Sequence, residues 1–219
     1  MTTYIDSEMT PIGKFLSSDS PIRVPPFQRS YSWTDEEVKQ LWSDLTEAID
    51  SKQAEYFLGP MVVKKADDYL EIIDGQQRIT TIYIILSTIR RLFLENGDNQ
   101  RADWFRNRYF GEQNVVNLET EPKFHMNEVN DHIFQKYVVS DTSDAKIRSG
   151  MRGLLKKDSN YLLLQAISLI WENLQERQTE VSPDGFDRDG LLAIQSFLQE
   201  NVFVLVLKVK DEADALCDF

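Results

Sequence analysis

The stretch Ile72-Ile73-Asp74-Gly75-Gln76-Gln77-Arg78-Ile79-Thr80 decides the fold, because an apolar run changes there into a helical pattern. A strand that turns through a glycine into a helix leaves unpaired N–H groups and a positive dipole end at the turn. Gly75 also lets the backbone approach a ligand closely, since it has no Cβ. We therefore predict an anion-binding helix start. The alternative is an ordinary surface turn that Asp74 caps.

The composition limits how the chain can meet nucleic acid. Its formal net charge is −12, whereas binding DNA by bulk attraction requires Lys and Arg gathered on one face. The nearest basic cluster is interrupted by Asp144 and Asp158, and we interpret it as a solvated helix face; it consists of Lys146, Arg148, Arg152, Lys156 and Lys157. Any contact with nucleic acid is therefore expected to be local, or to be made by parts outside this chain.

Cysteine usage and hydrophobicity predict a cytoplasmic protein. Cys217 is the one cysteine, so a disulfide within the chain is excluded and a reducing compartment is favoured. The N-terminus lacks the basic and apolar regions of a signal peptide. No apolar run reaches 18 residues, so we expect no membrane contact.

Hydrophobic periodicity predicts a mixture of helices and strands. Thr34 and Glu37 form a capping box before the first long helix. The strand at 202–209 is apolar on both faces and is therefore expected to be central. The expected elements are an amphipathic lead-in (1–20), an edge strand (22–26), helices (34–49, 76–95), a hairpin (56–63 with 69–73), a short helix within 98–117, a strand (123–126), a helix (128–138), a loop (139–160), helices (161–178, 187–200), the central strand and a helix start at 211–219.

We predict three parts along the chain: a core over 1–97, a mostly helical insertion or subdomain over 98–200, and a returning core strand with a truncated helix start over 201–219. The last segment is helical in pattern but ends without a cap. This predicts that the sequence is a piece of a longer protein.

A second group of polar side chains lies between the first strand and the capped helix. Gln28 and Arg29 offer amide and guanidinium donors, and Tyr31 and Trp33 offer aromatic faces with polar tips. Such a set suits a phosphate with a stacked base. The alternatives are that Trp33 is a hydrophobic staple on Val38 and that Tyr31 is a core anchor.

Three motifs together resemble a known family. Pro25–Trp33, Tyr56–Gly59 and the Asp-Gly-Gln-Gln-Arg box at 74–78 are similar in order and spacing to the N-terminal domain of GmrSD-type restriction enzymes, which also occurs in the phosphorothioate-sensing SspE proteins. The resemblance implies an α+β fold with a small mixed sheet of the ParB and sulfiredoxin type, surrounded by a mostly helical region. It also implies NTP binding and hydrolysis coupled to restriction of modified phage DNA.

The resemblance implies that the residues at 74–80 and those at 28–33 belong to one nucleotide site, which would also hold Mg²⁺. Phosphates would lie at the helix start, held by Gly75, Arg78 and Thr80, with Arg29 closing from the other segment. Asp74 would bind Mg²⁺ or orient the attacking water, and the sequence does not choose between these roles. Gln76 or Gln77 would position that water. Whether the base is that of GTP, UTP, CTP or ATP stays open.

The resemblance also assigns DNA sensing and a partner nuclease. Gln28, Tyr31 and Trp33 belong to a shared box whose tyrosine is implicated in sensing DNA modification. Family members continue into a C-terminal His-Asn-His nuclease domain, which this chain lacks. Its two histidines, His125 and His132, do not have that spacing, so we expect them to be structural or surface residues and expect no nuclease centre here. A homodimer is a further expected assembly.

Two other functions compete with an NTPase. One is a non-catalytic module that senses nucleotide or DNA and gates a partner nuclease. The other is direct nuclease activity, which is disfavoured because no carboxylate or histidine cluster has the spacing of metal ligands.

Overall fold

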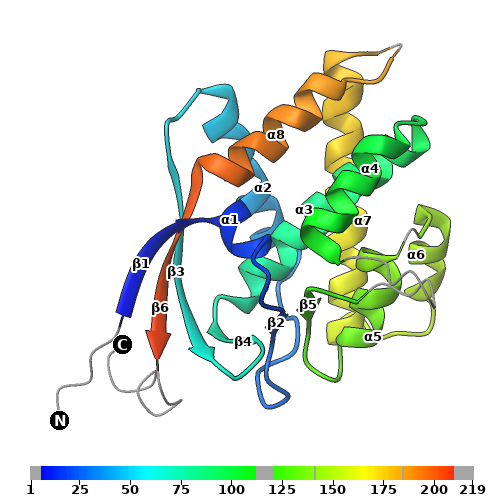
Figure 1. Ribbon diagram of the computed structural model, residues 1–219. Coiled ribbons are helices and arrows are strands. Elements are labelled where there is room, and N and C mark those ends of the chain that lie inside the picture. Colours follow the sequence, from blue (N-terminus) through cyan, green and yellow to red (C-terminus); the bar gives the residue numbers. More distant parts are fainter. Residues whose placement is uncertain (1–5, 112–120, 141, 184, 210–219) are drawn as a thin grey trace, which may run out of the picture.

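The protein has an α+β fold built on a single six-stranded sheet, as predicted (Figure 1). The computed structural model describes residues 6–111, 121–140, 142–183 and 185–209. The sheet order is β1-β6-β3-β4-β2-β5. The strands are β1 (Asp6–Pro11), β2 (Ile22–Arg23), β3 (Tyr56–Lys65), β4 (Leu70–Asp74), β5 (Phe124–His125) and β6 (Val202–Val209).

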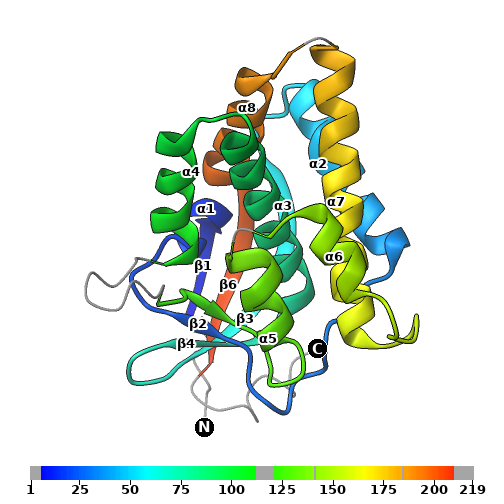
Figure 2. The same ribbon diagram turned by 90° about the vertical axis from the view of Figure 1, so that its right-hand side faces the viewer.

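The helices pack around α3, whose side chains are almost all buried. Helix α7 contacts α2, α3 and α6 in the outer part of this layer (Figure 2). The helices are α1 (Ile12–Leu16), α2 (Asp35–Asp50), α3 (Gln76–Glu95), α4 (Asn99–Phe105), α5 (Asp131–Phe134), α6 (Asp144–Gly150), α7 (Ser159–Val181) and α8 (Arg188–Glu200), and the π-helical turns η1 (Arg106–Phe110) and η2 (Gln135–Val139) follow α4 and α5.

Strand direction divides the sheet into two halves. Strands β3 and β4 form the predicted antiparallel hairpin, and β6 lies between β1 and β3, parallel to β3. Strands β4, β2 and β5 are parallel to one another. The carboxyl ends of these three strands therefore share one edge of the sheet.

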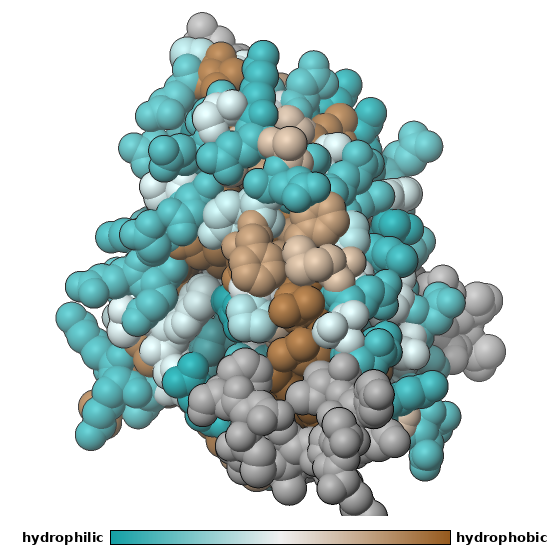
Figure 3. Space-filling model, turned by 90° about the vertical axis from the view of Figure 1, so that its left-hand side faces the viewer, coloured by the Kyte–Doolittle hydropathy of each residue, from teal (hydrophilic) through white to brown (hydrophobic). Residues whose placement is uncertain are grey.

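In the β1-β6-β3 half of the sheet, the central strand β6 carries apolar side chains on both faces. One face packs on helices, and Figure 1 shows no described helix on the other. Strand register places Met9 beside Leu205 and Phe57 beside Phe203 on this outer face. Met9 and Phe57 are both more than half exposed, and Figure 3 shows an apolar strip running down the middle of the face.

Most of the expected elements are confirmed, including the capping box of α2, the helix over 76–95 and the strand over 202–209. Three expectations were wrong. The lead-in contains strand β1, and the expected loop over 139–160 contains α6. Strand β2 is internal, between β4 and β5; it pairs at only Ile22 and Arg23, so Pro25 and Pro26 follow the strand and interrupt no ladder. The helix start expected at 211–219 lies outside the described residues.

The predicted three-part division stays a prediction. Strand β5, which lies within the expected insertion, is part of the same sheet. The buried core also runs without a break from the strands into α7. Within the described part of the chain, no helix has both the length and the apolar character of a membrane span.

Candidate functional site

Three loops meet at the carboxyl edge of β4, β2 and β5, and we call this region the loop edge. They comprise residues 74–78, where β4 ends and α3 begins, residues 24–34 after β2 and residues 126–130 after β5. Ligands of sheets with parallel strands commonly bind beyond the carboxyl ends of those strands. The fold therefore brings together the two segments that the sequence singled out and adds a third.

The turn after β4 has the predicted geometry. Gly75 is the N-cap of α3 and has φ +95°, in the left-handed region that favours glycine. A Cβ there would lie 3.0 Å from the Cγ of Met61. No side chain caps this 20-residue helix, so its first N–H groups have no side-chain acceptor. The Asp74 carboxylate beside them is 64% exposed.

Arg78 fastens the start of α3 to strand β3. Its Nη1 donates to the Leu58 carbonyl at 3.0 Å and its Nη2 to the Pro60 carbonyl at 2.6 Å. Nη2 also lies 3.6 Å from a carboxylate oxygen of Asp74. The guanidinium lies over Gly59, where an added Cβ would be 1.9 Å from Nη1. Arg78 therefore has a structural role in addition to the phosphate binding predicted for it.

Gln76 and Gln77 hold the loop after β2. The amide of Gln76 donates to the Arg29 carbonyl at 2.9 Å, and that of Gln77 donates to the Ser30 carbonyl at 3.2 Å. The side-chain oxygen of Gln77 accepts from the Ser32 N–H at 3.0 Å. Both glutamines are buried. These contacts orient the loop and support a positioning role for both side chains.

Arg29 is the exposed cation of the loop edge. Among the described residues, its guanidinium makes no hydrogen bond or ion pair, although the Gln76 amide fixes its carbonyl. The side chain of Gln28 is half-buried, and the Gln28 carbonyl accepts from Asn127 at 3.0 Å. The backbone of this segment is therefore held, while the Arg29 side chain is available to a ligand.

Three further predicted site residues, Tyr31, Trp33 and Thr80, are also partly or wholly buried. Tyr31 is 1% exposed, and its hydroxyl bonds to Thr81 at 3.0 Å, which matches the core-anchor alternative. Burial raises the pKa of the Tyr31 hydroxyl, so it stays protonated. Trp33 packs partly buried against the core, as a staple would. Thr80 is 0% exposed and offers a ligand no surface in this conformation.

The sequence reasoning missed two buried asparagines in the third loop. The Asn130 side-chain oxygen accepts from the Tyr31 N–H at 2.8 Å, and its amide donates to Ser159 and Asn160 at the start of α7. The Asn127 amide donates to the Gln28 carbonyl and to Ser30. An Asn-x-x-Asn spacing directly after a strand is a turn signal, but its partner 99 residues earlier is visible only in the fold.

The loop edge has two exposed carboxylates, Asp74 at the start of α3 and Glu128 in the loop after β5. In the described ranges, no group of three or more His, Cys, Asp or Glu side chains could hold a metal. Mg²⁺ in nucleotide sites is commonly held by one or two carboxylates together with the phosphates themselves. The exposed position of Asp74 fits that mode, in which the nucleotide brings most of the ligands.

Comparison with known proteins gives one family. The family described as GmrSD restriction endonuclease, N-terminal domain, matches residues 12–218, which is nearly the whole chain. No curated protein matches the sequence. The matched range contains all three loops of the loop edge.

Proposed function

Because the chain belongs to the family of GmrSD restriction endonuclease N-terminal domains, we propose that it is the nucleotide-binding switch of a restriction system. In this proposal the domain binds and slowly hydrolyses an NTP with Mg²⁺ in the cytoplasm. It thereby controls cleavage of modified DNA by a His-Asn-His nuclease domain. The role in restriction follows from the family, whereas the nucleotide, the modified DNA and the nuclease partner belong to the proposal.

One observation carries the proposal: the uncapped start of α3 lies at the same edge of the sheet as the exposed residues Asp74 and Arg29. Helix N-termini and guanidinium groups are both favourable partners for phosphate. The Gln76 amide donates to the Arg29 carbonyl at 2.9 Å, which holds the Arg29 loop against the start of α3. We call the start of α3 together with Asp74 and Arg29 the phosphate cradle. The site therefore meets phosphates through a few placed groups, which agrees with a net charge of −12.

The contacts divide the predicted roles among the side chains. Arg29 and the N–H groups after Gly75 would bind phosphate, and Asp74 would hold Mg²⁺ or orient water. Gln76 and Gln77 would position the Arg29 loop rather than a water, since their amides already bond to backbone carbonyls. Arg78 is a poor probe of binding because its removal also unfastens β3.

Arg29→Ala is the substitution that tests the phosphate site. Its guanidinium has no partner among the described residues, so the free energy of unfolding should stay within about 0.5 kcal/mol of wild type. Affinity for an NTP with Mg²⁺, measured by titration calorimetry, should fall at least about tenfold because a charge-assisted contact is lost. Arg152→Ala is the matched control, since Arg152 is also exposed. Equal NTP affinities in both variants would overturn the proposal.

A non-catalytic gate is the second candidate, and the glutamine contacts favour it. With Gln76 and Gln77 engaged in the loop, the helix start keeps the exposed Asp74 carboxylate but has no glutamine amide left to position a water. Phosphate release measured with each NTP, with and without modified DNA, separates the candidates. Saturable binding without turnover in any condition would establish the gate and exclude the NTPase.

A further inference from the structure

A groove on the sheet surface lies directly behind the loop edge. It has a volume of about 420 Å³, which falls within the range of small-molecule sites. Its lining includes Arg23, Pro25, Pro26, Tyr69, Glu71 and His125. We call it the Arg23 groove.

Strand register forms the floor of the Arg23 groove. Arg23 of β2 pairs with Glu71 of β4 on one side and with His125 of β5 on the other. Neighbouring strands are about 4.8 Å apart, and paired residues share a face of the sheet. The Glu71 carboxylate, the Arg23 guanidinium and the His125 imidazole therefore lie in one row across the three strands.

Each member of the row is held by a neighbour. The Arg23 guanidinium lies 4.5 Å from the centre of the Tyr69 ring, and Glu71 lies 3.6 Å from the Lys64 ammonium. The His125 Nδ1 lies 3.3 Å from an Asp131 oxygen. Within the described part of the chain, the Arg23 guanidinium makes no hydrogen bond or ion pair. Its donors are therefore positioned by stacking and remain available to a ligand.

The charge of the groove disfavours a polyanion as its occupant. Three carboxylates line it, those of Glu71, Glu128 and Asp131, against the guanidinium of Arg23 and the imidazole of His125. Prolines and an aromatic ring supply flat apolar walls. A neutral planar ring with donors and acceptors on its rim fits this lining, and a nucleobase has that chemistry.

The position of the groove relates it to the phosphate cradle. Glu71 precedes Asp74 by three residues of β4, a span of about 10 Å at about 3.3 Å per residue. Pro25 and Pro26 line the groove and lead into Gln28 and Arg29. One end of a nucleotide could therefore lie at the helix start while the other lies over the row.

We propose that the Arg23 groove binds the nucleobase of the nucleotide whose phosphates lie at the start of α3, and that Arg23 and Glu71 select the base. This inference rests on the proposed function for its phosphate end. Arg23 would donate to ring nitrogen or carbonyl acceptors, and Glu71 would accept from an exocyclic amino group. Such paired contacts discriminate between bases by about 1–3 kcal/mol, or about 5- to 150-fold in affinity.

The test compares base preference with binding of phosphates alone. Affinities for ATP, GTP, CTP, UTP and inorganic triphosphate, each with Mg²⁺, are measured for wild type, Arg23→Gln and Glu71→Gln. Wild type should prefer one base at least about tenfold, and both variants should lose most of that preference while binding inorganic triphosphate normally. Arg152→Gln, at an exposed position away from the groove, should behave as wild type. Thermal unfolding shows that the variants fold.

Several results would overturn the inference. One is a wild type that binds all four NTPs and inorganic triphosphate equally, and another is variants with unchanged preference. A third is that the Arg23 and Glu71 variants bind a single-stranded oligonucleotide more weakly but bind NTPs as wild type does. The groove would then bind a base of DNA and not the base of the nucleotide. Failure of the phosphate site is distinguishable: nucleosides would still bind through Arg23 and Glu71, but inorganic triphosphate would not bind and Arg29→Ala would have no effect.

Discussion

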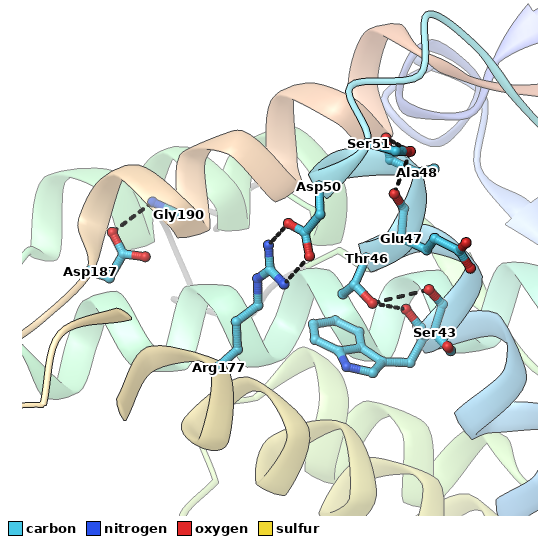
Figure 4. Close-up of polar contacts among 10 residues, drawn as sticks. Ser43, Thr46, Glu47, Ala48, Asp50, Ser51, Arg177, Asp187 and Gly190 are labelled. Carbon is cyan, nitrogen blue, oxygen red and sulfur yellow. Dashed lines mark hydrogen bonds and ion pairs between the residues drawn. The ribbon is translucent and has the colours of Figure 1, made fainter. Parts of the chain in front are cut away.

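The loop edge and the seam between α2 and α7 are both fastened by an arginine, and the two arginines differ in what they bind. Arg78 donates to two neutral carbonyls of β3 and lies against Gly59. Arg177 of α7 makes a two-bond ion pair with Asp50 at the end of α2, at 3.1 and 2.5 Å (Figure 4).

Solvent explains why these fastenings differ in importance. The Asp50 carboxylate is 59% exposed, so water and salt can replace much of what Arg177 supplies. Asn130 at the loop edge is fully buried, and so is its bond with the Tyr31 N–H, which water does not screen. Substitutions that remove buried contacts at the loop edge should therefore change stability by several kcal/mol, and those at the seam by less.

The largest effect is expected for Gly59→Ala. Gly59 has φ +119°, and the new Cβ would be 1.9 Å from the Arg78 Nη1. Backbone strain of about 1–2 kcal/mol and overpacking of about 1–3 kcal/mol should together lower the free energy of unfolding by about 3 kcal/mol or more. Urea denaturation measures the change.

Gly97→Ala separates backbone strain from overpacking, the two causes of the loss expected for Gly59→Ala. Gly97 also has a positive φ, +74°, but no atom lies within 4 Å of an added Cβ. Only the backbone term applies, so the loss should be about 1–2 kcal/mol. If both glycine variants lose the same stability, the Arg78 guanidinium does not press on Gly59 in solution.

The second effect is expected for Asn130→Ala, which removes the buried link between the loop edge and α7. The Tyr31 N–H and the partners at Ser159 and Asn160 lose their bonds. Leaving the buried Tyr31 N–H unpaired and losing two half-buried bonds should together lower the free energy of unfolding by about 2–4 kcal/mol. In the control Asn99→Ala, at an exposed position, the change should stay within about 0.5 kcal/mol. A similarly small change at Asn130 would show that the link is not formed in solution.

A third, smaller change is expected for Thr80→Val, and it should be a gain. The Thr80 hydroxyl is buried and has no hydrogen-bond partner among the described residues. Replacing it with a methyl group of similar size should raise the free energy of unfolding by about 1 kcal/mol. Nucleotide affinity should not change, because the side chain has no exposed surface. Weakened binding with unchanged stability would instead restore Thr80 as a ligand residue.

At the seam, Asp50→Asn should lower the free energy of unfolding by less than about 1 kcal/mol. The difference from wild type should shrink further as salt is raised from about 0.1 M to 1 M, because screening weakens exposed pairs. Chemical denaturation at the two salt concentrations measures both effects. A salt-independent loss of several kcal/mol would remove the contrast between the seam and the loop edge.

The smallest effect is a pH dependence of the same pair. The bond from Arg177 lowers the pKa of Asp50 below its ordinary value of 3.8. A carboxylate with a depressed folded-state pKa stabilises the protein above its unfolded-state pKa and loses that contribution as pH falls through the folded value. The stability difference between wild type and Asp50→Asn should therefore be constant at neutral pH and shrink below about pH 4. A difference that grows on acidification would contradict the shift.

Local sequence patterns were sufficient for much of the fold. The capping box located the start of α2, and Gly75 located the start of α3. The apolar run at 202–209 predicted an internal strand, and β6 does lie between two others. Short elements such as β1 and α6 escaped prediction, because a few residues carry too little periodicity to outweigh a polar composition.

The sequence by itself thus determined the strand-glycine-helix turn, because a left-handed residue and a helix start depend on neighbouring residues. It also identified Asp74 and Arg29 as candidate polar groups of the site. Only the tertiary structure decided that Arg78, Gln76 and Gln77 have carbonyl partners, and that Tyr31 is buried. The same holds for Asn130 and for the row of Glu71, Arg23 and His125. These partners lie far apart along the chain, and they meet because β4, β2 and β5 run parallel and bring their loops to one edge.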